Sequence, residues 1–349
     1  MAHYHLIQWV LFFYIYCFLG WVWESCYVSV RQHKWVNRGF MHGPFLPIYG
    51  FGAVMILLAT IPVKENLGLV FICGMVGATL LEYITGTFME ALFHVRYWDY
   101  SEEPFNLNGH ICLLSSLAWG GFSVLMIKVL HQPIEAVVLL LNYSWAEIIA
   151  LLVSIAIMMD LIESFNEAMD LKKMLIHLSE SNVEIQLIRK RLDVVITAVD
   201  TDAAKLKEKL LQSKQKLEEK WWEEKAHYEL QLKAMSSKAL IENGMEKIKE
   251  GKNLVLQALS EKANTYLGQI EEYTSEKGRM PVKELGKLKI ELEELTEKII
   301  SQKEKVLQLK NKAYKHSVGI LRRNPNAISK KHKAALEEIK QKVRLKRKS

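Results

Sequence analysis

The chain has 349 residues, 50% of them hydrophobic, and a formal net charge of +7. These averages combine two different parts, because residues 1–159 hold only six Lys or Arg and nine Asp or Glu, and all other charges follow them. An ordinary soluble domain is therefore excluded for the first part, which has the composition of a membrane domain, whereas the remainder is charged and water-exposed.

Five apolar stretches approach the length needed to cross ~30 Å of hydrocarbon as a helix. They are His5–Val30, Phe45–Ile61, Gly68–Phe93, Ile111–Leu130 and Ile134–Met159. The sequence therefore predicts an all-α fold: a polytopic membrane helix bundle with five spans, followed by a long cytoplasmic helical region. Lys and Arg concentrate after the first, third and fifth stretches, which places the N-terminus outside and the C-terminus in the cytoplasm.

The first connection, residues 37–52, is unusual because glycines and prolines punctuate it and it continues directly into apolar sequence. Non-helical backbone at membrane depth has to be buried in protein or line a wet cavity. We therefore expect a bent or re-entrant start to the second helix, facing a polar site. A tight turn without function is the alternative.

Four carboxylates fall inside the predicted spans, namely Glu24, Glu82, Glu90 and Glu147. A charge at that depth costs several kcal/mol unless it is paired or hydrated, so each is a candidate functional residue. Helical spacing places Glu82 and Glu90 on one face of the third span. Structural ion pairs with nearby arginines are the alternative.

The third connection, residues 94–110, is aromatic, polar and glycine-ended, and it shares the predicted cytoplasmic side with the first connection. We expect the two connections and the deep carboxylates to form one polar binding cluster. Its candidate members are Glu24, Asn37, Arg38, Tyr49, Glu82, Glu90, Arg96, Trp98, Asp99 and Asn106. We assign no catalytic residue and no metal ligand, and we expect no cofactor.

Several ordered motifs carry a family resemblance: 20–25, 37–40, 43–50, 81–83 with 89–90, 98–101 with 105–109, and 111–113 with 119–120. Over about residues 8–159 the chain resembles the bacterial membrane family known as putative ABC-transporter type IV. The resemblance implies a small polytopic bundle, a permease-like role in transport and a location in the bacterial plasma membrane. Residues 321–331 are similar to the C-terminal end of that family.

Helical patterns continue after residue 159. Apolar residues three and four apart recur over 185–199 and 285–309, which is typical of a coiled coil. The expected breaks are Gly244, Gly251, residues 277–281 and residues 324–326. We interpret these as an antiparallel helical hairpin, with a parallel dimeric coiled coil, and so a homo-oligomer, as the alternative.

The last segment, residues 322–349, holds eleven Lys or Arg and two Glu. Contact with anionic lipid headgroups is one interpretation and a solvated tail is the other. We do not expect nucleic acid as a partner, since no binding fold is recognisable. The predicted domains are thus 1–159 in the membrane, 160–322 as the helical region and 323–349 as the basic tail.

No Walker A sequence is present, so an ATP-driven transporter would need its ATPase on a separate chain. A transport component binding a substrate or ion is therefore our first hypothesis. The alternatives are a membrane-anchored scaffold that recruits partners through its helical region, and an intramembrane enzyme that uses the carboxylates as acid or base.

Overall fold

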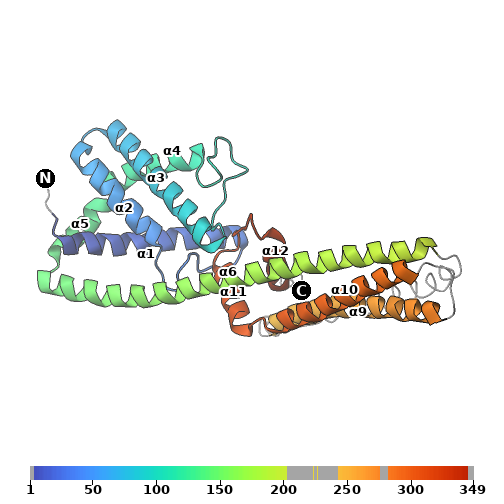
Figure 1. Cartoon of the computed structure of the whole chain (residues 1–349). Coiled ribbons are helices and arrows are strands. Elements are labelled where there is room, and N and C mark those ends of the chain that lie inside the picture. Colours follow the sequence, from blue (N-terminus) through green and yellow to red (C-terminus); the bar gives the residue numbers. More distant parts are fainter. Residues whose placement is uncertain (1–3, 203–222, 224–225, 227–242, 276–281, 345–349) are drawn as a thin grey trace. The chain divides into compact units, whose positions relative to one another are not determined.

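A computed structural model describes residues 4–202, 223, 226, 243–275 and 282–344 (Figure 1). The elements within these ranges are helices, apart from two isolated β-bridges, which confirms the predicted all-α class. The chain divides into two compact units. The first, the membrane unit, comprises Met1–Lys172 and Gly319–Lys333, and the second, the helical unit, comprises Lys173–Val318 and Ala334–Ser349. We call residues 319–333 the C-terminal strap.

The first three helices of the membrane unit follow the predicted apolar stretches closely, whereas the fourth and fifth stretches are divided at a different place. The helices are α1 (Leu6–Gln32), α2 (Pro47–Thr60) with a 3-10 turn (Ile61–Val63), α3 (Leu67–Phe93), α4 (Leu113–Leu125), a π-helical turn (Met126–Leu130), α5 (His131–Leu140) and the first part of α6 (Tyr143–Asp202). Because α2 begins only at Pro47, the whole stretch from His33 to Leu46 is non-helical.

By length and composition, four of the described helical segments are suited to crossing a membrane: Leu6–Gln32, Leu67–Phe93, Leu113–Leu140 and Tyr143–Thr197. The fifth apolar helical segment, Pro47–Val63, is shorter. At 1.5 Å per residue it spans roughly 25 Å, somewhat less than the ~30 Å of a bilayer core. A fifth crossing, and the orientation that depends on it, stay predictions.

One expected boundary is wrong. The sequence predicted a break between the fourth and fifth apolar stretches at residues 131–133, but the helix continues through Pro133 to Leu140. Proline lacks the N–H that an uninterrupted α-helix needs, and π-helical turns let a helix absorb such a defect. The π-helical turn Met126–Leu130 immediately precedes this region, and the chain reverses at Leu141–Asn142 instead.

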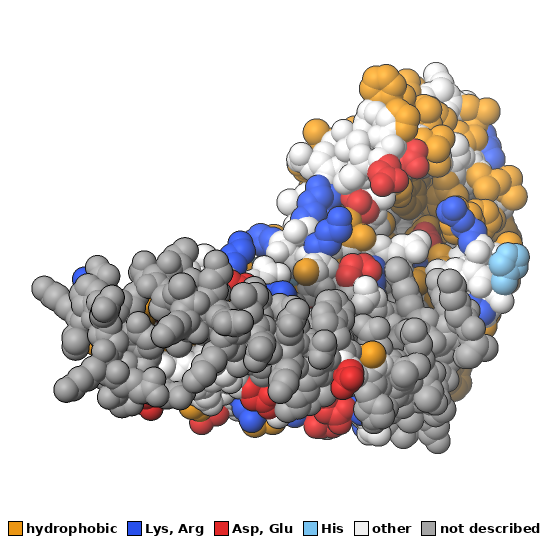
Figure 2. Space-filling model, turned by 90° about the vertical axis from the view of Figure 1, so that its right-hand side faces the viewer, with side chains coloured by type: hydrophobic (Ala, Val, Ile, Leu, Met, Phe, Trp, Pro, Cys, Tyr) orange, Lys and Arg blue, Asp and Glu red, His pale blue; other side chains and the backbone are white. Residues whose placement is uncertain are grey.

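The surface of the membrane unit is apolar where it would meet lipid. The upper part of Figure 2, where α2 and α3 lie in Figure 1, is covered mainly by hydrophobic side chains. Ile84 and Phe88 of α3 and Leu152 of α6 are among the large side chains that are more than half exposed. Such a patch exceeds what a soluble monomer usually exposes, and it suits a lipid environment.

Small residues allow the helices of the membrane unit to pack closely, as expected for membrane bundles. A Cβ atom added to Gly20 of α1 would lie 2.3 Å from Cγ of Tyr49 on α2. At Gly74 of α3 it would lie 2.1 Å from Oγ of Ser123 on α4. Gly77 of α3 differs, because no atom of another segment lies within 4 Å of the position its Cβ would take.

This contrast gives a first prediction. Gly20→Val should lower the free energy of unfolding by about 1–3 kcal/mol, because α1 and α2 have to move apart to admit the side chain. Gly77→Val is the matched control, with the same change in a helix but open space, and should alter stability by less than about 0.5 kcal/mol. Unfolding of the detergent-solubilised protein by SDS measures both, and equal losses would contradict the close-approach argument.

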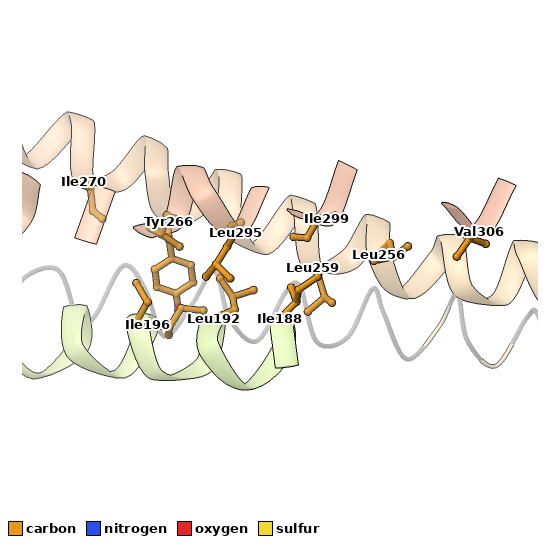
Figure 3. Packing of buried hydrophobic residues seen from close by; sticks show 13 residues of the cluster. Ile188, Leu192, Ile196, Leu256, Leu259, Tyr266, Ile270, Leu295, Ile299 and Val306 are labelled. Atoms are coloured by element: carbon orange, nitrogen blue, oxygen red, sulfur yellow. The ribbon is translucent and has the colours of Figure 1, made fainter. Parts of the chain in front are cut away.

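The helical unit contains the second part of α6, α9 (Gly244–Ser275) and α10 (Val282–Leu307), with most of α11 (Asn311–Arg323) and α12 (Lys333–Arg344). Thirteen buried residues of α6, α9 and α10 form one hydrophobic core. Figure 3 shows Tyr266 pointing from α9 toward α6, near Leu192 and Ile196. The predicted apolar repeat of α10 contributes Leu292, Leu295, Ile299 and Val306 to this core.

The predicted helix breaks have mixed outcomes. Gly244 begins α9 and α11 ends directly before Asn324, as expected, but Gly251 lies inside α9. A single glycine costs a helix only ~1 kcal/mol, less than the burial of Ile248 and Leu256 on either side contributes. The predicted turn at residues 278–281 lies outside the described residues. Whether copies of the chain also pair as a coiled coil stays a prediction.

Candidate functional site

The first polar group of the membrane unit surrounds Glu24 of α1. Tyr49, in the first turn of α2, donates a hydrogen bond from its hydroxyl to Glu24 Oε1 at 2.8 Å. Arg38, in the non-helical connection before α2, places its Nε 3.9 Å from Glu24 Oε2. Burial lowers the pKa of Arg38, and Glu24 acts in the opposite direction. The structure thus brings together three of the predicted residues.

Glu82 of α3 is the most buried of the carboxylates predicted in the spans, with 6% of its surface exposed. Trp119 of α4 donates from Nε1 to Glu82 Oε2 at 3.0 Å, and Tyr100 donates from its hydroxyl to Oε1 at 3.2 Å. Burial raises the pKa of Tyr100, and the charge of the nearby Glu82 raises it further. The phenol therefore stays protonated and remains a hydrogen-bond donor. The ring centroids of Tyr49 and Trp119 lie 5.7 Å apart, which links the group around Glu24 to the group around Glu82. We call Glu24 and Glu82 the carboxylate pair.

A second polar group lies around Arg96, at the start of the 94–110 connection. Its Nε lies 2.7 Å from Glu90 Oε2, and its Nη1 lies 3.1 Å from Asp99 Oδ1. His110 Nε2 lies 3.2 Å from the same Glu90 oxygen. Burial and the Arg96 charge lower the pKa of His110, which favours neutral imidazole. Arg96 is thus the cation on which two predicted carboxylates converge.

Three predicted site residues organise loops instead of joining the carboxylates. Asn37 accepts a hydrogen bond from Trp21 Nε1 at 2.6 Å and donates to a backbone carbonyl in its own connection. Trp98 donates from its indole to the His110 carbonyl at 3.0 Å. Asn106 donates from its amide to the carbonyls of Ser101 and Glu103. Glu147, the fourth predicted carboxylate, is exposed on α6.

The C-terminal strap packs into the membrane unit, which sequence reasoning missed. Asn324 accepts a hydrogen bond from Arg38 Nη1 and donates to the Gly39 carbonyl at 2.8 Å. Ile328 forms an antiparallel β-bridge with Arg96, with N–O distances of 2.8 and 3.0 Å. The strap therefore contacts both unusual connections. The similarity of residues 321–331 to a family C-terminal end was the one available signal.

A further polar group, also missed, lies where α6 begins to leave the apolar region. Asp160 Oδ1 and Glu167 Oε2 lie 3.0 and 3.2 Å from the two ring nitrogens of His42. Glu167 also forms an ion pair with Arg323 of the strap at 2.6 Å, and both side chains are 10% exposed. Asp160 follows the predicted end of the fifth span by one residue, so it was not counted among the deep carboxylates. The spacing of Asp160, Ser164 and Glu167 on one helix face could have identified it.

Comparison with known protein families found a match, which covers the part of the chain that holds most of these groups. Residues 11–165 match the family described as putative ABC-transporter type IV. The resemblance expected from the motifs is thereby confirmed over these residues, and with the four long apolar helices it indicates a membrane protein. No curated protein and no solved structure matched the chain.

The match to the ABC-transporter type IV family includes the carboxylate pair, Arg38, Arg96 and Asp160, but ends before Glu167 and before the strap. It also includes Tyr16, His131 and Glu135, which the sequence analysis did not consider and which form a polar group with Tyr4, a residue that precedes the matched part. His131, after the π-helical turn, contacts the hydroxyls of Tyr4 and Tyr16 at 3.3 and 3.1 Å, and Tyr4 donates to Glu135. Among the described residues, no group of three or more His, Cys, Asp or Glu could hold a metal ion.

Proposed function

We propose that this chain is the permease component of an ATP-driven transporter, with its binding site at the carboxylate pair. The observation that carries the proposal is the aromatic link between Glu24 on α1 and Glu82 on α3 inside an apolar bundle, since Tyr49, which binds Glu24, packs its ring against Trp119, which binds Glu82. Glu82 is buried and Glu24 is partly buried. Carboxylates within spanning helices are expensive to maintain and usually mark a substrate or ion pathway.

The hydrogen bonds around the pair support a binding role. Tyr49, Tyr100 and Trp119 all donate to these carboxylates, and each is an aromatic side chain that also offers an apolar surface. Arg38 pairs with Glu24, whereas Tyr100 and Trp119, which donate to Glu82, are neutral. A site of this kind favours a cargo that carries positive charge or several hydrogen-bond donors.

The energy source would be a second chain. The sequence has no Walker A motif, and the family name implies an ATP-binding partner. A membrane-anchored scaffold is the second candidate, favoured by the separate hydrophobic core of the helical unit, which can fold as a docking module for other proteins. Both candidates place the protein in a bilayer, which we propose is the bacterial plasma membrane.

Purification of the full-length chain from its native membrane tests the two candidates. A permease should co-purify with a chain that carries a Walker A motif, and the reconstituted complex should hydrolyse ATP. Glu82→Gln should lower that rate by about tenfold or more, since one charge of the binding site is lost. Glu147→Gln is the matched control, with the same change at an exposed carboxylate, and should leave the rate unchanged.

Two results would contradict the permease. One is a purified complex without any ATPase chain, and the other is full ATP hydrolysis by Glu82→Gln with its response to cargo intact. Recovery of other partner proteins through the helical unit alone would then favour the scaffold.

A further inference from the structure

Two histidines from separate segments stack on each other in the membrane unit, and two lysines add positive charge around them. His94 ends α3, Lys172 lies on α6, and Lys331 and His332 belong to the C-terminal strap. We call these four residues the histidine–lysine site. None of them belongs to the carboxylate pair or to the Arg96 group.

The contacts of the two histidines define the centre of the histidine–lysine site. The rings of His94 and His332 stack with centroids 5.4 Å apart and planes 21° apart, and Nδ1 of His94 lies 3.2 Å from Nε2 of His332. Ser329 donates from its hydroxyl to the His94 carbonyl at 2.6 Å, which anchors the strap beside the ring. His94 itself takes the left-handed conformation, with φ of 58°, as the C-terminal cap of α3.

Lys172 is oriented by one hydrogen bond, from Nζ to the Leu92 carbonyl at 3.0 Å. An ammonium group has three donors, so two of them can bind another oxygen. The Lys331 side chain is exposed, and its charge acts on His94. The site thus offers one fixed and one adaptable ammonium group beside two imidazole rings.

The charged groups that act on the His94 imidazole are all bases. Burial lowers its pKa, and the charged neighbours that add to this effect are Lys172, Lys331 and His332, all of them cationic when protonated. A bound anion would relieve the repulsion among these groups. Since two lysines are present, an anion with two negative charges matches the site better than a single carboxylate.

We propose that the histidine–lysine site binds a phosphate monoester or a free phosphate dianion. The phosphate oxygens accept hydrogen bonds from Lys172, Lys331 and the Nε2–H of His94, since Nδ1 of His94 already faces His332. Because the four residues come from α3, α6 and the strap, the bound anion also holds the strap on the membrane unit. A lipid headgroup and a soluble phosphate share this chemistry.

Thermal unfolding of the full-length protein in detergent tests the site, with inorganic phosphate titrated at constant ionic strength. Phosphate should raise the unfolding midpoint, and equivalent chloride should not. Lys331→Gln should weaken the apparent phosphate affinity by about tenfold, since one charge-assisted contact is lost. Lys333→Gln, the same change at an exposed strap residue two positions away, is the matched control and should keep the affinity.

A second set of measurements distinguishes the two sources of phosphate. The protein is placed in nanodiscs of phosphatidylcholine alone, or with phosphatidic acid or phosphatidylglycerol. Stabilisation by phosphatidic acid beyond phosphatidylglycerol identifies a lipid phosphomonoester, and stabilisation by free phosphate alone identifies a soluble ligand. Phosphate that acts no better than chloride, together with equal effects of the two anionic lipids, would overturn the proposal. So would equal loss of affinity in Lys331→Gln and Lys333→Gln.

Discussion

Arg323→Leu should destabilise the membrane unit by about 3–5 kcal/mol, because it leaves the buried Glu167 without its cation. The two side chains are each 10% exposed and their closest atoms are 2.6 Å apart. Arg323 Nη2 also points to the Phe40 carbonyl, at 3.5 Å, so the substitution removes a second contact between the strap and the first connection. SDS-induced unfolding of the detergent-solubilised protein measures the loss.

The double variant Arg323→Leu with Glu167→Leu isolates the ion pair. It should cost much less than the sum of the two single changes, since no charge is then left unpaired. Arg322→Leu is the matched control, because Arg322 is the exposed neighbour on the same helix, and it should change stability by less than about 0.5 kcal/mol. Strict additivity of the single losses would show that the pair does not couple the strap to α6.

Arg96→Leu is the second substitution with a large expected effect, again about 3–5 kcal/mol. The Arg96 side chain is 5% exposed and pairs with both Glu90 and Asp99, so its loss leaves two carboxylates without their cation. The β-bridge to Ile328 uses only backbone atoms and is expected to persist. Arg31→Leu, at an exposed position, is the control and should change stability by less than about 1 kcal/mol.

The effect of Arg96→Leu should depend on pH. In the natural protein Arg96 helps to lower the pKa of His110, so protonation of His110 below pH ~6.5 costs stability. In the variant that repulsion is gone and Glu90 remains, so the His110 pKa rises and imidazolium replaces part of the lost charge at acidic pH. The difference in stability between the two proteins should therefore be smaller at pH ~5.5 than at pH ~8. If the stability difference between the natural protein and Arg96→Leu is the same at both pH values, His110 does not replace Arg96 as the partner of Glu90.

Local sequence patterns predicted the elements of the fold and the first part of the site. Glu24 and Glu82 stood out because a carboxylate inside an apolar stretch is recognisable without knowing its neighbours. Arg38 and Arg96 were added to the predicted cluster because both lie in the connections assigned to the same side of the membrane. Each of these inferences used only spacing, hydropathy and charge over a few dozen residues.

The features that were missed depend on contacts between distant parts of the chain. Asn324 meets Arg38 and Gly39 across more than 280 positions, and no local pattern indicates such a contact. The Asp160 group was missed for a different reason, since a span boundary derived from hydropathy is uncertain by a few residues. The break predicted at residues 131–133 was wrong because Pro133 suggested the end of a helix. The π-helical turn that accommodates this proline has no recognisable sequence pattern.

The path of the chain through the membrane unit determines where insertions and deletions can be tolerated. A Cβ atom added to Gly319 would lie 3.6 Å from Glu167 Oε1, and Glu167 precedes Lys172 by five residues, roughly 7.5 Å of helix. The chain therefore leaves and rejoins the membrane unit at neighbouring points, with Lys173–Val318 nested between them. Host domains tolerate insertions whose two ends are this close. The nested segment can thus change in length while its host keeps the same geometry, provided that the segment still packs with α12, which belongs to the same unit.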